Sequence, residues 1–375
     1  AIAVSAAVQA DRALFDDDKT AFFGVLRSEA MIQGARNSMP GVRWFLDLNR
    51  AVSHLYGMEA QDGTELTGWV VLDPMLRVIA VASLDQTAQV MALLAGLPAV
   101  DDHAATELFA PVLVLPRVFD ADLCHRLIRA YETGLQEPSG FMREVDGRTV
   151  GVFDSASKRR TDHIIEDGPI RAEIRSCITR RLLPQIQRAF SFRATRMERY
   201  IVACYDGAEG GFFRPHRDDM SKGTDHRRFA VTINLNAEDY EGGDLVFPEF
   251  GSRTYRAPTG GAVVFSCSLL HGAEPVTAGR RYAFLPFLYD EAGEQLRQAV
   301  ARRLQHAVDD VQQRLTGRAG RDVTGAQPGH AALGHHRVRL AEQRLADDRG
   351  ALAVLTRLDR RTQTGASGTD DDDVE

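Results

Sequence analysis

The second half of the chain alternates short apolar segments with turn-forming clusters, and this pattern constrains the fold more than any other feature. From about residue 195 to residue 292, clusters of glycine, proline, aspartate and asparagine separate runs that have the composition of β-strands. The strand candidates are Tyr200–Tyr205, Phe229–Leu235, Asp244–Phe247, Arg253–Arg256, Ala262–Phe265 and Tyr282–Tyr289. Many short strands at this spacing predict a jelly roll or a β-sandwich.

Helical signals precede these strands. Asp120 is expected to cap a helix that has one apolar face, and Gly134 is expected at the C′ position of that helix. Residues 169–190 show helical periodicity again, and Pro184 is expected to kink or split this second helix. We therefore expect an α+β domain over residues 111–292, with helices that flank the strands.

The two ends of the chain differ from this central domain. Residues 1–98 mix helix and strand signals: Gly68–Val81 predicts two short strands around a turn, and Gln86–Leu97 predicts a helix. Residues 99–110 are weakly patterned and are predicted to be a linker. Residues 293–375 are poor in core-forming residues and predict a tail that is partly helical or disordered.

Charge, cysteine content and hydropathy exclude several classes of protein. The net charge of −7 argues against nucleic-acid binding through bulk charge. The cysteines are far apart and form no CxxC pair, which favours a reducing cytoplasm over a disulfide framework or a structural zinc site. No apolar run approaches the ~20 residues of a membrane span, and the apolar opening Ala1–Ala10 has no basic residue before it, which indicates a truncated start and not a signal peptide. We expect a cytoplasmic protein without nucleic-acid or membrane partners.

One constellation of residues points to metal chemistry. His216 and Asp218 are two residues apart, so on an extended strand both side chains would lie on the same side. A third candidate ligand, His271, follows an apolar strand candidate, and Arg281 lies ten residues beyond it. Two histidines and a carboxylate occupy one face of an octahedral Fe(II) ion and leave three positions open. An arginine offers a bidentate fork for the far carboxylate of a bound dicarboxylic 2-oxo acid.

The region 111–292 resembles the Fe(II)/2-oxoglutarate-dependent dioxygenases, specifically the prolyl 4-hydroxylase-like branch. The matching segments are Glu198–Asp219, Gly242–Gly251 and Gly260–Phe284. The family pattern is HxD, about fifty residues, a second histidine, and a basic residue about ten positions further on. The resemblance implies a double-stranded β-helix (jelly roll). It also implies Fe(II), 2-oxoglutarate and O2 as cofactor and co-substrates, with ascorbate as a further candidate.

The same resemblance assigns roles to individual residues. It gives metal binding to His216, Asp218 and His271, co-substrate binding to Arg281 and Tyr205, and no catalytic residue beyond the metal ligands. Arg280 is the rival for the co-substrate carboxylate, because only one of two neighbouring strand residues can face the barrel interior. The ten-residue spacing from His271 favours Arg281.

Other polar residues are given less specific roles. Asn234 or Thr232 is expected to line the pocket where some relatives carry a tyrosine. His163 and His226 are expected to be surface or structural residues. The polar segment Asp154–His163 is expected to be a solvated loop, with a mobile loop over the active site as the alternative.

Residues 12–98 resemble, more faintly, the C-terminal half of a thioredoxin-like peroxiredoxin domain. The segments that carry this resemblance are Leu14–Val25 and Gly68–Val81. A peroxiredoxin needs a low-pKa thiolate near the start of its fold, but the first cysteine of this chain is Cys124. We expect a partial thioredoxin-like α/β region that docks or presents substrate and has no peroxidase activity.

Together these features predict a 2-oxoglutarate- and Fe(II)-dependent oxygenase that hydroxylates a C–H bond and releases succinate and CO2. A prolyl or other peptide residue is the candidate substrate, and a small molecule is the alternative. Two other classes stay open at this point: a cupin-like metal-binding protein, such as an isomerase or a sensor, that does not use 2-oxoglutarate, and a catalytically inactive interaction module. The sequence does not define an oligomeric state.

Overall fold

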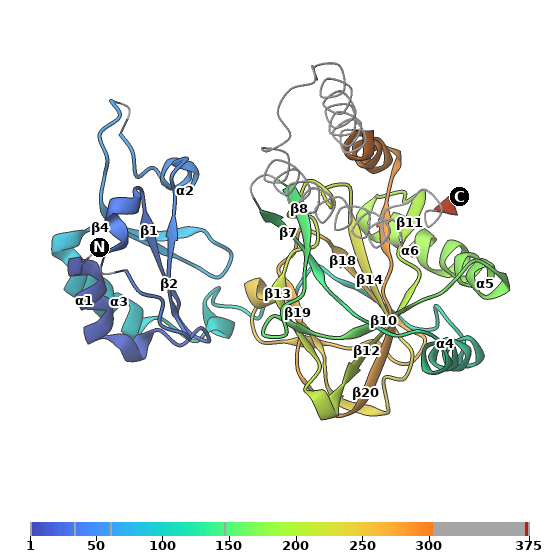
Figure 1. The fold of residues 1–375 in the computed structure, drawn as a ribbon. Helices are drawn as coiled ribbons and strands as arrows, with labels where there is room; N and C mark the ends of the chain where they lie inside the picture. The colour runs from blue at the N-terminus through green and yellow to red at the C-terminus, as the bar shows by residue number, and fades with distance from the viewer. Residues whose placement is uncertain (1, 34, 61, 146–147, 303–371, 374–375) are drawn as a thin grey trace, which may run out of the picture. The chain divides into compact units, whose positions relative to one another are not determined.

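A computed structural model describes residues 2–33, 35–60, 62–145, 148–302 and 372–373 (Figure 1). The chain divides into two compact units. The first unit contains Ala1–Ala110 and Phe247–Arg253, and the second contains Pro111–Val246 and Thr254–Glu375. The predicted linker, residues 99–110, falls in the first unit. Of the predicted tail, the structure describes only residues 293–302, which are helical, and 372–373; the rest lies outside the described residues.

The first unit combines two small pairs of strands with helices. Its elements are α1 (Ile2–Ala10), β1 (Phe22–Leu26), β2 (Val42–Leu46), α2 (Ala51–Leu55), β3 (Gly68–Leu72), β4 (Val78–Ser83) and α3 (Thr87–Gly96). β1 and β2 are parallel, whereas β3 and β4 form an antiparallel hairpin, as the strand pattern around Asp73 predicts. Phe22, Trp69 and Val90 are buried in a shared apolar core.

The second unit is built around a large antiparallel sheet. Its strands are β5 (Leu113–Leu115), β6 (Glu137–Pro138), β10 (Thr161–Ile164), β11 (Arg196–Glu198), β12 (Ile201–Asp206), β14 (Phe229–Asn234), β15 (Tyr240–Gly242), β18 (Ala262–Ser266), β20 (Val276–Phe284), β21 (Phe287–Tyr289) and β22 (Asp372–Asp373). The order along the main path is β22-β11-β21-β14-β20-β12-β10-β6, while β15, β18 and β5 pair beside it. Every pairing in this sheet is antiparallel.

A smaller antiparallel sheet completes the second unit. Its order is β17-β16-β19-β13-β9. These strands are β9 (Lys158–Arg159), β13 (Phe212–His216), β16 (Leu245–Val246), β17 (Thr254–Tyr255) and β19 (His271–Ala273), and a separate hairpin is formed by β7 (Phe141–Val145) and β8 (Arg148–Val152). Two antiparallel sheets of short strands with flanking helices agree with the α+β class and with the jelly roll that the sequence predicts.

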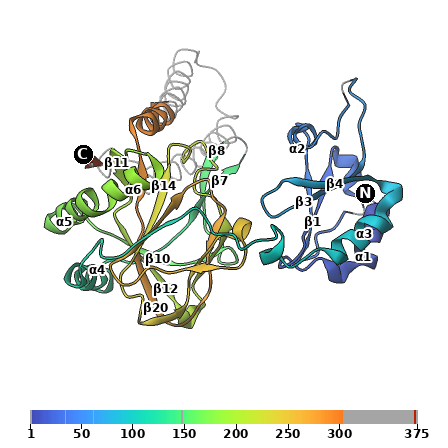
Figure 2. The ribbon, with the colours of Figure 1, turned by 180° about the vertical axis from the view of Figure 1, so that it is seen from behind.

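Three helices cover one face of the large sheet. They are α4 (Ala121–Thr133), α5 (Pro169–Cys177) and α6 (Leu183–Phe190), and they lie along the same side of the unit in both views (Figure 2). Val202 and Cys204 of β12 pack into the apolar core beneath these helices. Because side chains alternate along a strand, Ala203 and Tyr205 lie on the other face, in a separate buried cluster.

The long helical segment over residues 169–190 is split, as Pro184 predicts. The five residues Ile178–Leu182 form a π-helical stretch between α5 and α6. The proline is the second residue of α6, where its missing N–H is tolerated. Ile174, Ile178, Leu182 and Ile186 all lie fully inside the core.

The structure corrects two expected ends. Tyr282–Tyr289 is not one strand: β20 begins earlier, at Val276, and ends at Phe284, and β21 starts only after Pro286, which cannot donate to a sheet ladder. Helix α4 is capped by Asp120, whose side chain accepts a hydrogen bond from the Leu123 backbone N–H. Gly134 follows the helix, but its φ of −94° is not left-handed.

Asp154–His163 was expected to be a solvated loop, and this prediction is wrong over its second half. Residues 158–159 form β9, in the smaller sheet, and residues 161–164 form β10, in the large sheet. The segment therefore contributes a strand to each sheet. Thr161 and His163 pair with Cys204 and Val202 of β12. Four of its polar side chains line a cavity, although their composition is that of a solvated loop: Lys158, Arg160, Asp162 and His163.

Within the described ranges, no helix has both the length and the apolar character needed to cross a membrane.

Candidate active site

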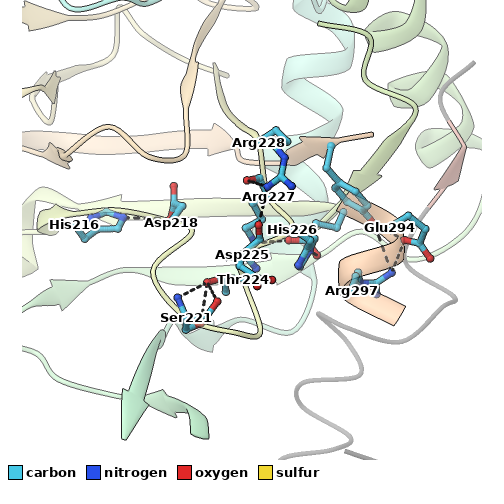
Figure 3. Close-up of polar contacts among 12 residues, drawn as sticks. His216, Asp218, Ser221, Thr224, Asp225, His226, Arg227, Arg228, Glu294 and Arg297 are labelled. Carbon is cyan, nitrogen blue, oxygen red and sulfur yellow. Dashed lines mark hydrogen bonds and ion pairs between the residues drawn. The ribbon is translucent and has the colours of Figure 1, made fainter. Parts of the chain in front are cut away.

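Two neighbouring strands of the smaller sheet bring His216, Asp218 and His271 together. His216 is the last residue of β13, and His271 is the first residue of β19; the two strands are antiparallel and place these histidines directly opposite each other. Asp218 follows two residues after His216, where its backbone N–H donates to the Cys267 carbonyl at 3.0 Å. One potential ligand atom from each of the three residues lies within 4.8 Å of the others. Figure 3 shows His216 and Asp218 side by side.

Both histidines are oriented by their own backbone. Nδ1 of His216 lies 2.8 Å from the Arg214 carbonyl, and Nδ1 of His271 lies 2.9 Å from the Leu269 carbonyl. A carbonyl only accepts, so each Nδ1 carries a proton in this arrangement, and each Nε2 faces the Asp218 carboxylate. The Nε2–carboxylate distances are 3.5 Å from His216 and 3.3 Å from His271. Such a second hydrogen bond on Nδ1 is what fixes a metal-binding imidazole.

The protonation states suit a cation. Burial and the nearby charge of His271 lower the pKa of His216, which favours the neutral, ligating imidazole. Burial alone would raise the pKa of Asp218, but the charge of His271 and hydrogen bonds from both histidines hold it well below its usual range. Two imidazoles and one carboxylate that converge on one point form the donor set of a divalent metal ion, which matches the 2-His-1-carboxylate pattern.

Arg281 and Tyr205 lie on the cavity face of the large sheet. They are direct partners across β20 and β12, and the Arg281 guanidinium lies 4.9 Å from the centre of the Tyr205 ring. Arg281 is only 2% exposed, and its Nε and Nη1 have no hydrogen-bond partner among the described residues. A Cβ at Gly243, whose φ is 68°, would come within 3.2 Å of the Arg281 side chain. A buried guanidinium with unsatisfied donors fits an absent anionic ligand.

Arg280 points the other way. Its Nε is 2.9 Å from Asp206, and its side chain is 59% exposed. Tyr282, which has the same parity along β20, packs into the core beneath the helices. The alternation of the strand therefore separates the two arginines, and only Arg281 faces the cavity.

Thr232 and Asn234 were the two candidates for the place where some relatives carry a tyrosine, and they have different environments. Thr232 lines the cavity. Asn234, two residues further along β14, instead donates through Nδ2 to the Ala257 carbonyl at 2.7 Å. Of the two candidates, Thr232 is the one that reaches the site.

These groups share one large cavity inside the second unit. Its volume is about 2170 Å³, and its lining includes the metal-ligand candidates, Tyr205 and Arg281. Three apolar side chains that also line it remain well exposed: Met142 of β7, Phe153 after β8 and Met220 after Asp218. The cavity therefore combines the polar groups of the candidate site with apolar side chains, some of which are exposed at its rim.

The sequence interpretation missed a buried polar network beside Tyr205. The Arg160 guanidinium forms an ion pair with Asp162 at 2.8 Å and donates to the Tyr205 hydroxyl at 3.3 Å. Lys158 is 7% exposed and donates to Ser139 Oγ at 2.8 Å. The signal that could have revealed this network is the spacing of Lys158, Arg160 and Asp162 at every second position, which is the period of a strand.

The remaining histidines have different environments. His226 is 2% exposed and lies 3.2 Å from Glu198, which also forms an ion pair with Arg227. His226 is therefore structural and not on the surface. His163, whose Nδ1 lies 2.8 Å from the Leu135 carbonyl, is a half-buried residue of β10. Neither histidine belongs to the described metal-ligand cluster.

Comparison with known proteins gives consistent findings. Residues 200–289 match the model of the 2OG-Fe(II) oxygenase superfamily. The chain is 27% identical to the PKHD-type hydroxylase PiuC of Pseudomonas aeruginosa over 59% of this chain and 92% of that protein. It is 27% identical to a PKHD-type hydroxylase of Stutzerimonas stutzeri over 46% and 76% of the two chains. A solved prolyl hydroxylase from Trichoplax adhaerens, in complex with a hypoxia inducible factor peptide fragment, superimposes with a TM-score of 0.41 at 19% identity, over 50% and 86% of the two chains.

The matching domain carries its two histidines, its carboxylate and its buried arginine in the order that the sequence predicts. The chain is therefore an Fe(II)- and 2-oxoglutarate-dependent dioxygenase, an enzyme that uses O2 for hydroxylation. Within that class it is prolyl 4-hydroxylase-like, as its PKHD-type relatives indicate. The cupin-like alternative without 2-oxoglutarate and the inactive-module alternative are thereby set aside.

Proposed function

We propose that His216, Asp218 and His271 hold the Fe(II) ion of this enzyme. The observation that carries this proposal is the convergence of two imidazole nitrogens and one carboxylate within 4.8 Å of one another, with both imidazoles fixed through Nδ1. When bound there, iron supplies the activation of O2 that hydroxylation of a C–H bond requires. The three ligands occupy one face of the ion and leave the other positions to co-substrates.

We propose in addition that Arg281 and Tyr205 bind 2-oxoglutarate. The unsatisfied Nε and Nη1 of Arg281 support a bidentate contact with the far carboxylate of the co-substrate. Tyr205 contributes its ring to the arginine and its hydroxyl to the pocket, where Arg160 orients it. These two residues bind and position the co-substrate on the cavity face of the large sheet. Ascorbate is a candidate reductant for this site.

A prolyl or other peptide residue is our proposed substrate. The support is the cavity itself: it is much larger than the volume of about 300–1,000 Å³ that a small-molecule site has, and its rim exposes Met142, Phe153 and Met220. Exposed apolar side chains at a rim are typical of a surface that binds another chain. A small-molecule substrate would leave this rim without a function.

The iron site is tested by His216→Ala and Asp218→Ala. Each variant removes one of three ligands, so we expect loss of stoichiometric Fe(II) binding and a decrease of at least ~100-fold in succinate formation from 2-oxoglutarate. Asp219→Asn is the matched control, because Asp219 accepts a hydrogen bond from Ser268 and lies outside the ligand cluster. Full turnover by both ligand variants would refute the assignment.

The first unit is proposed to be a partial thioredoxin-like module that docks or presents substrate. The hairpin β3–β4 followed directly by α3 supports this, since a hairpin and a helix end the thioredoxin-like fold that the sequence resembles. Residues 1–98 contain no cysteine, so we expect no thiol-dependent consumption of peroxide, and a peroxide assay on the whole chain tests this. A cytoplasmic location is part of the same proposal.

A further inference from the structure

The cavity contains more positive than negative charge beside the co-substrate residues. Lys158, Arg160, Arg199 and Arg227 all line it and come from neighbouring strands or their ends. We call these four residues the cationic wall. Buried charges are stable only with counter-charges or hydrogen bonds, so the partners of each side chain decide what the wall can bind.

Two carboxylates are shared among the four cations. Asp162 lies 2.8 Å from Arg160 and 3.7 Å from Arg199, and Glu198 pairs with Arg227. Arg160 and Arg227 therefore have a close counter-charge each. Lys158 and Arg199 have none at hydrogen-bonding distance in the described part of the chain.

The hydrogen-bond partners of Lys158 in the described part of the chain are neutral. Its Nζ donates to Ser139 Oγ at 2.8 Å and to the Gly140 carbonyl at 2.7 Å, and it lies 4.5 Å from the centre of the Phe213 ring. Burial and the nearby charge of Arg160 lower its pKa well below the usual value. The Phe213 ring in turn stacks on His216 at 3.5 Å, so this ammonium group lies one side chain away from the proposed iron site.

Arg199 is held in an unfavourable backbone conformation. Its φ of 69° is in the left-handed region, which a residue with a Cβ rarely adopts. Its side chain is 22% exposed and packs 5.1 Å from the Phe287 ring. Burial and the charge of Arg160 lower its pKa to about 10. An arginine with no role beyond solubility would adopt neither a left-handed backbone conformation nor a position beside the positive charge of Arg160.

We propose that Lys158 and Arg199 bind a carboxylate of the substrate, and that this enzyme therefore selects acidic polypeptide segments. This rests on the proposed hydroxylation of a peptide residue. The exposed apolar rim contacts the body of the segment, while the incoming carboxylate supplies Lys158 and Arg199 with the hydrogen-bonded negative partner that they lack among the described residues. Arg281 holds 2-oxoglutarate on a different strand, β20, so the two anions bind to separate groups.

The test measures peptide binding while the co-substrate site is filled. Three fluorescent peptides share a central Ala-Pro-Gly and carry Glu, Gln or Lys on both sides; anisotropy is read with Mn(II) and saturating 2-oxoglutarate under argon. We expect the Glu peptide to bind at least ~10-fold more tightly than the Gln peptide and the Lys peptide to bind most weakly. If an excess of N-acetylglutamate displaces the Glu peptide, a carboxylate alone is sufficient for binding to this site. If it does not, the polypeptide around the carboxylate is needed as well. Either result is compatible with the proposed carboxylate site.

Variants then locate the effect. Lys158→Met keeps the apolar stem against Phe213 and should reduce the preference for Glu over Gln at least ~5-fold, and Arg199→Gln should do the same. Arg159→Gln is the matched control, because this neighbouring arginine is exposed and, among the described residues, donates to the Ser155 and Glu209 carbonyls. The preference of the control should equal that of the wild type.

Three results would overturn the proposal: no binding of the Glu peptide to the wild type, equal binding of Glu and Gln peptides, or a preference that survives in both cationic-wall variants. The first two results use only the unaltered protein, so misfolding of a variant cannot mask them. Succinate release from 2-oxoglutarate is measured in parallel. If it persists while the preference is absent, the carboxylate site alone is wrong; if it is absent in the wild type, the proposed function fails as well.

Discussion

Neighbouring residues of a strand have opposite environments in this protein, and this decides their chemistry. Arg280 and Arg281 have the same side chain, yet one pairs with Asp206 on the surface and the other is buried beside Tyr205. The difference follows from the alternation of side chains along β20. The roles of these two arginines therefore follow from which face of β20 each side chain occupies, and not from the residue type.

Substitution of Arg281 should affect the co-substrate selectively. Arg281→Ala removes the proposed charge-assisted contact with 2-oxoglutarate, and loss of one buried charged partner is worth roughly 2–5 kcal/mol. We expect the KM for 2-oxoglutarate to rise at least ~30-fold in a steady-state assay of succinate formation. Arg280→Ala is the matched control and should stay within about twofold of the wild type. An increase confined to Arg280→Ala would reverse the assignment.

The site residues differ in how far the sequence predicts them. His216, Asp218, His271 and Arg281 could be predicted because their spacing along the chain is itself the signal. The cationic wall could not, since Lys158 of β9 and Arg199, between β11 and β12, come from separate segments that line one cavity. The spacing of residues along the chain can be read from the sequence, but the register between paired strands depends on tertiary packing.

At the scale of elements, the ends of helices and strands are less predictable than their presence. The sequence predicts α3, α4 and the split at Pro184, and the structure contains all three. It does not predict the break between β20 and β21 or the strands β9 and β10. Polar residues that line a cavity have the same composition as solvated loops, so hydropathy cannot distinguish them.

Gly134 gives a test at this scale. A Cβ there would lie 2.1 Å from the His163 ring and 2.7 Å from the Ala130 carbonyl oxygen. Glycine is therefore needed at this position because a side chain would clash, and not because the backbone is left-handed. We expect Gly134→Ala to lower the free energy of unfolding by about 1–3 kcal/mol, measured by chemical denaturation. Gly151→Ala, where a Cβ meets nothing within 4 Å, is the control and should leave stability nearly unchanged. Equal effects of the two substitutions would contradict the steric explanation.

At the scale of the whole molecule, a few buried charges link stability to pH. Glu198 is 1% exposed and is bonded to Arg227 and His226. Burial alone would raise its pKa, but the charge of Arg227 and the hydrogen bond from His226 outweigh burial and hold the pKa well below the usual range. The folded state therefore binds fewer protons than the unfolded state at acidic pH, and this pair stabilises the fold only while Glu198 is ionised.

The expected pH dependence has a defined sign. The contribution of Glu198 is complete above the unfolded pKa of about 4.3 and is lost as the pH falls from there toward its lower folded pKa. Glu198→Gln leaves Arg227 buried without its counter-charge, so we expect a loss of about 3–5 kcal/mol at pH 7. The difference from the wild type should shrink as the pH falls below about 4, as urea titrations at several pH values would show.

A surface ion pair provides the control for this prediction. Glu173 pairs with Arg126 and is 39% exposed. Because exposed pairs are screened by water and salt, Glu173→Gln should cost no more than about 1 kcal/mol at pH 7. A loss in Glu173→Gln as large as that in Glu198→Gln would show that burial is not the cause.

The π-helical stretch at Ile178–Leu182 also has a consequence for insertions and deletions. Ile174, Ile178, Leu182 and Ile186 recur at every fourth residue, whereas a regular α-helix turns once in 3.6 residues. Over three such steps a straight α-helix would rotate the last isoleucine roughly a third of a turn away from the first. The π-helical stretch has more residues per turn, so it compensates for this rotation and keeps all four side chains on one buried line. A helix with one residue fewer in this stretch would keep its length almost unchanged but would carry Ile186 away from the core, so the length of this segment is constrained as strictly as its composition.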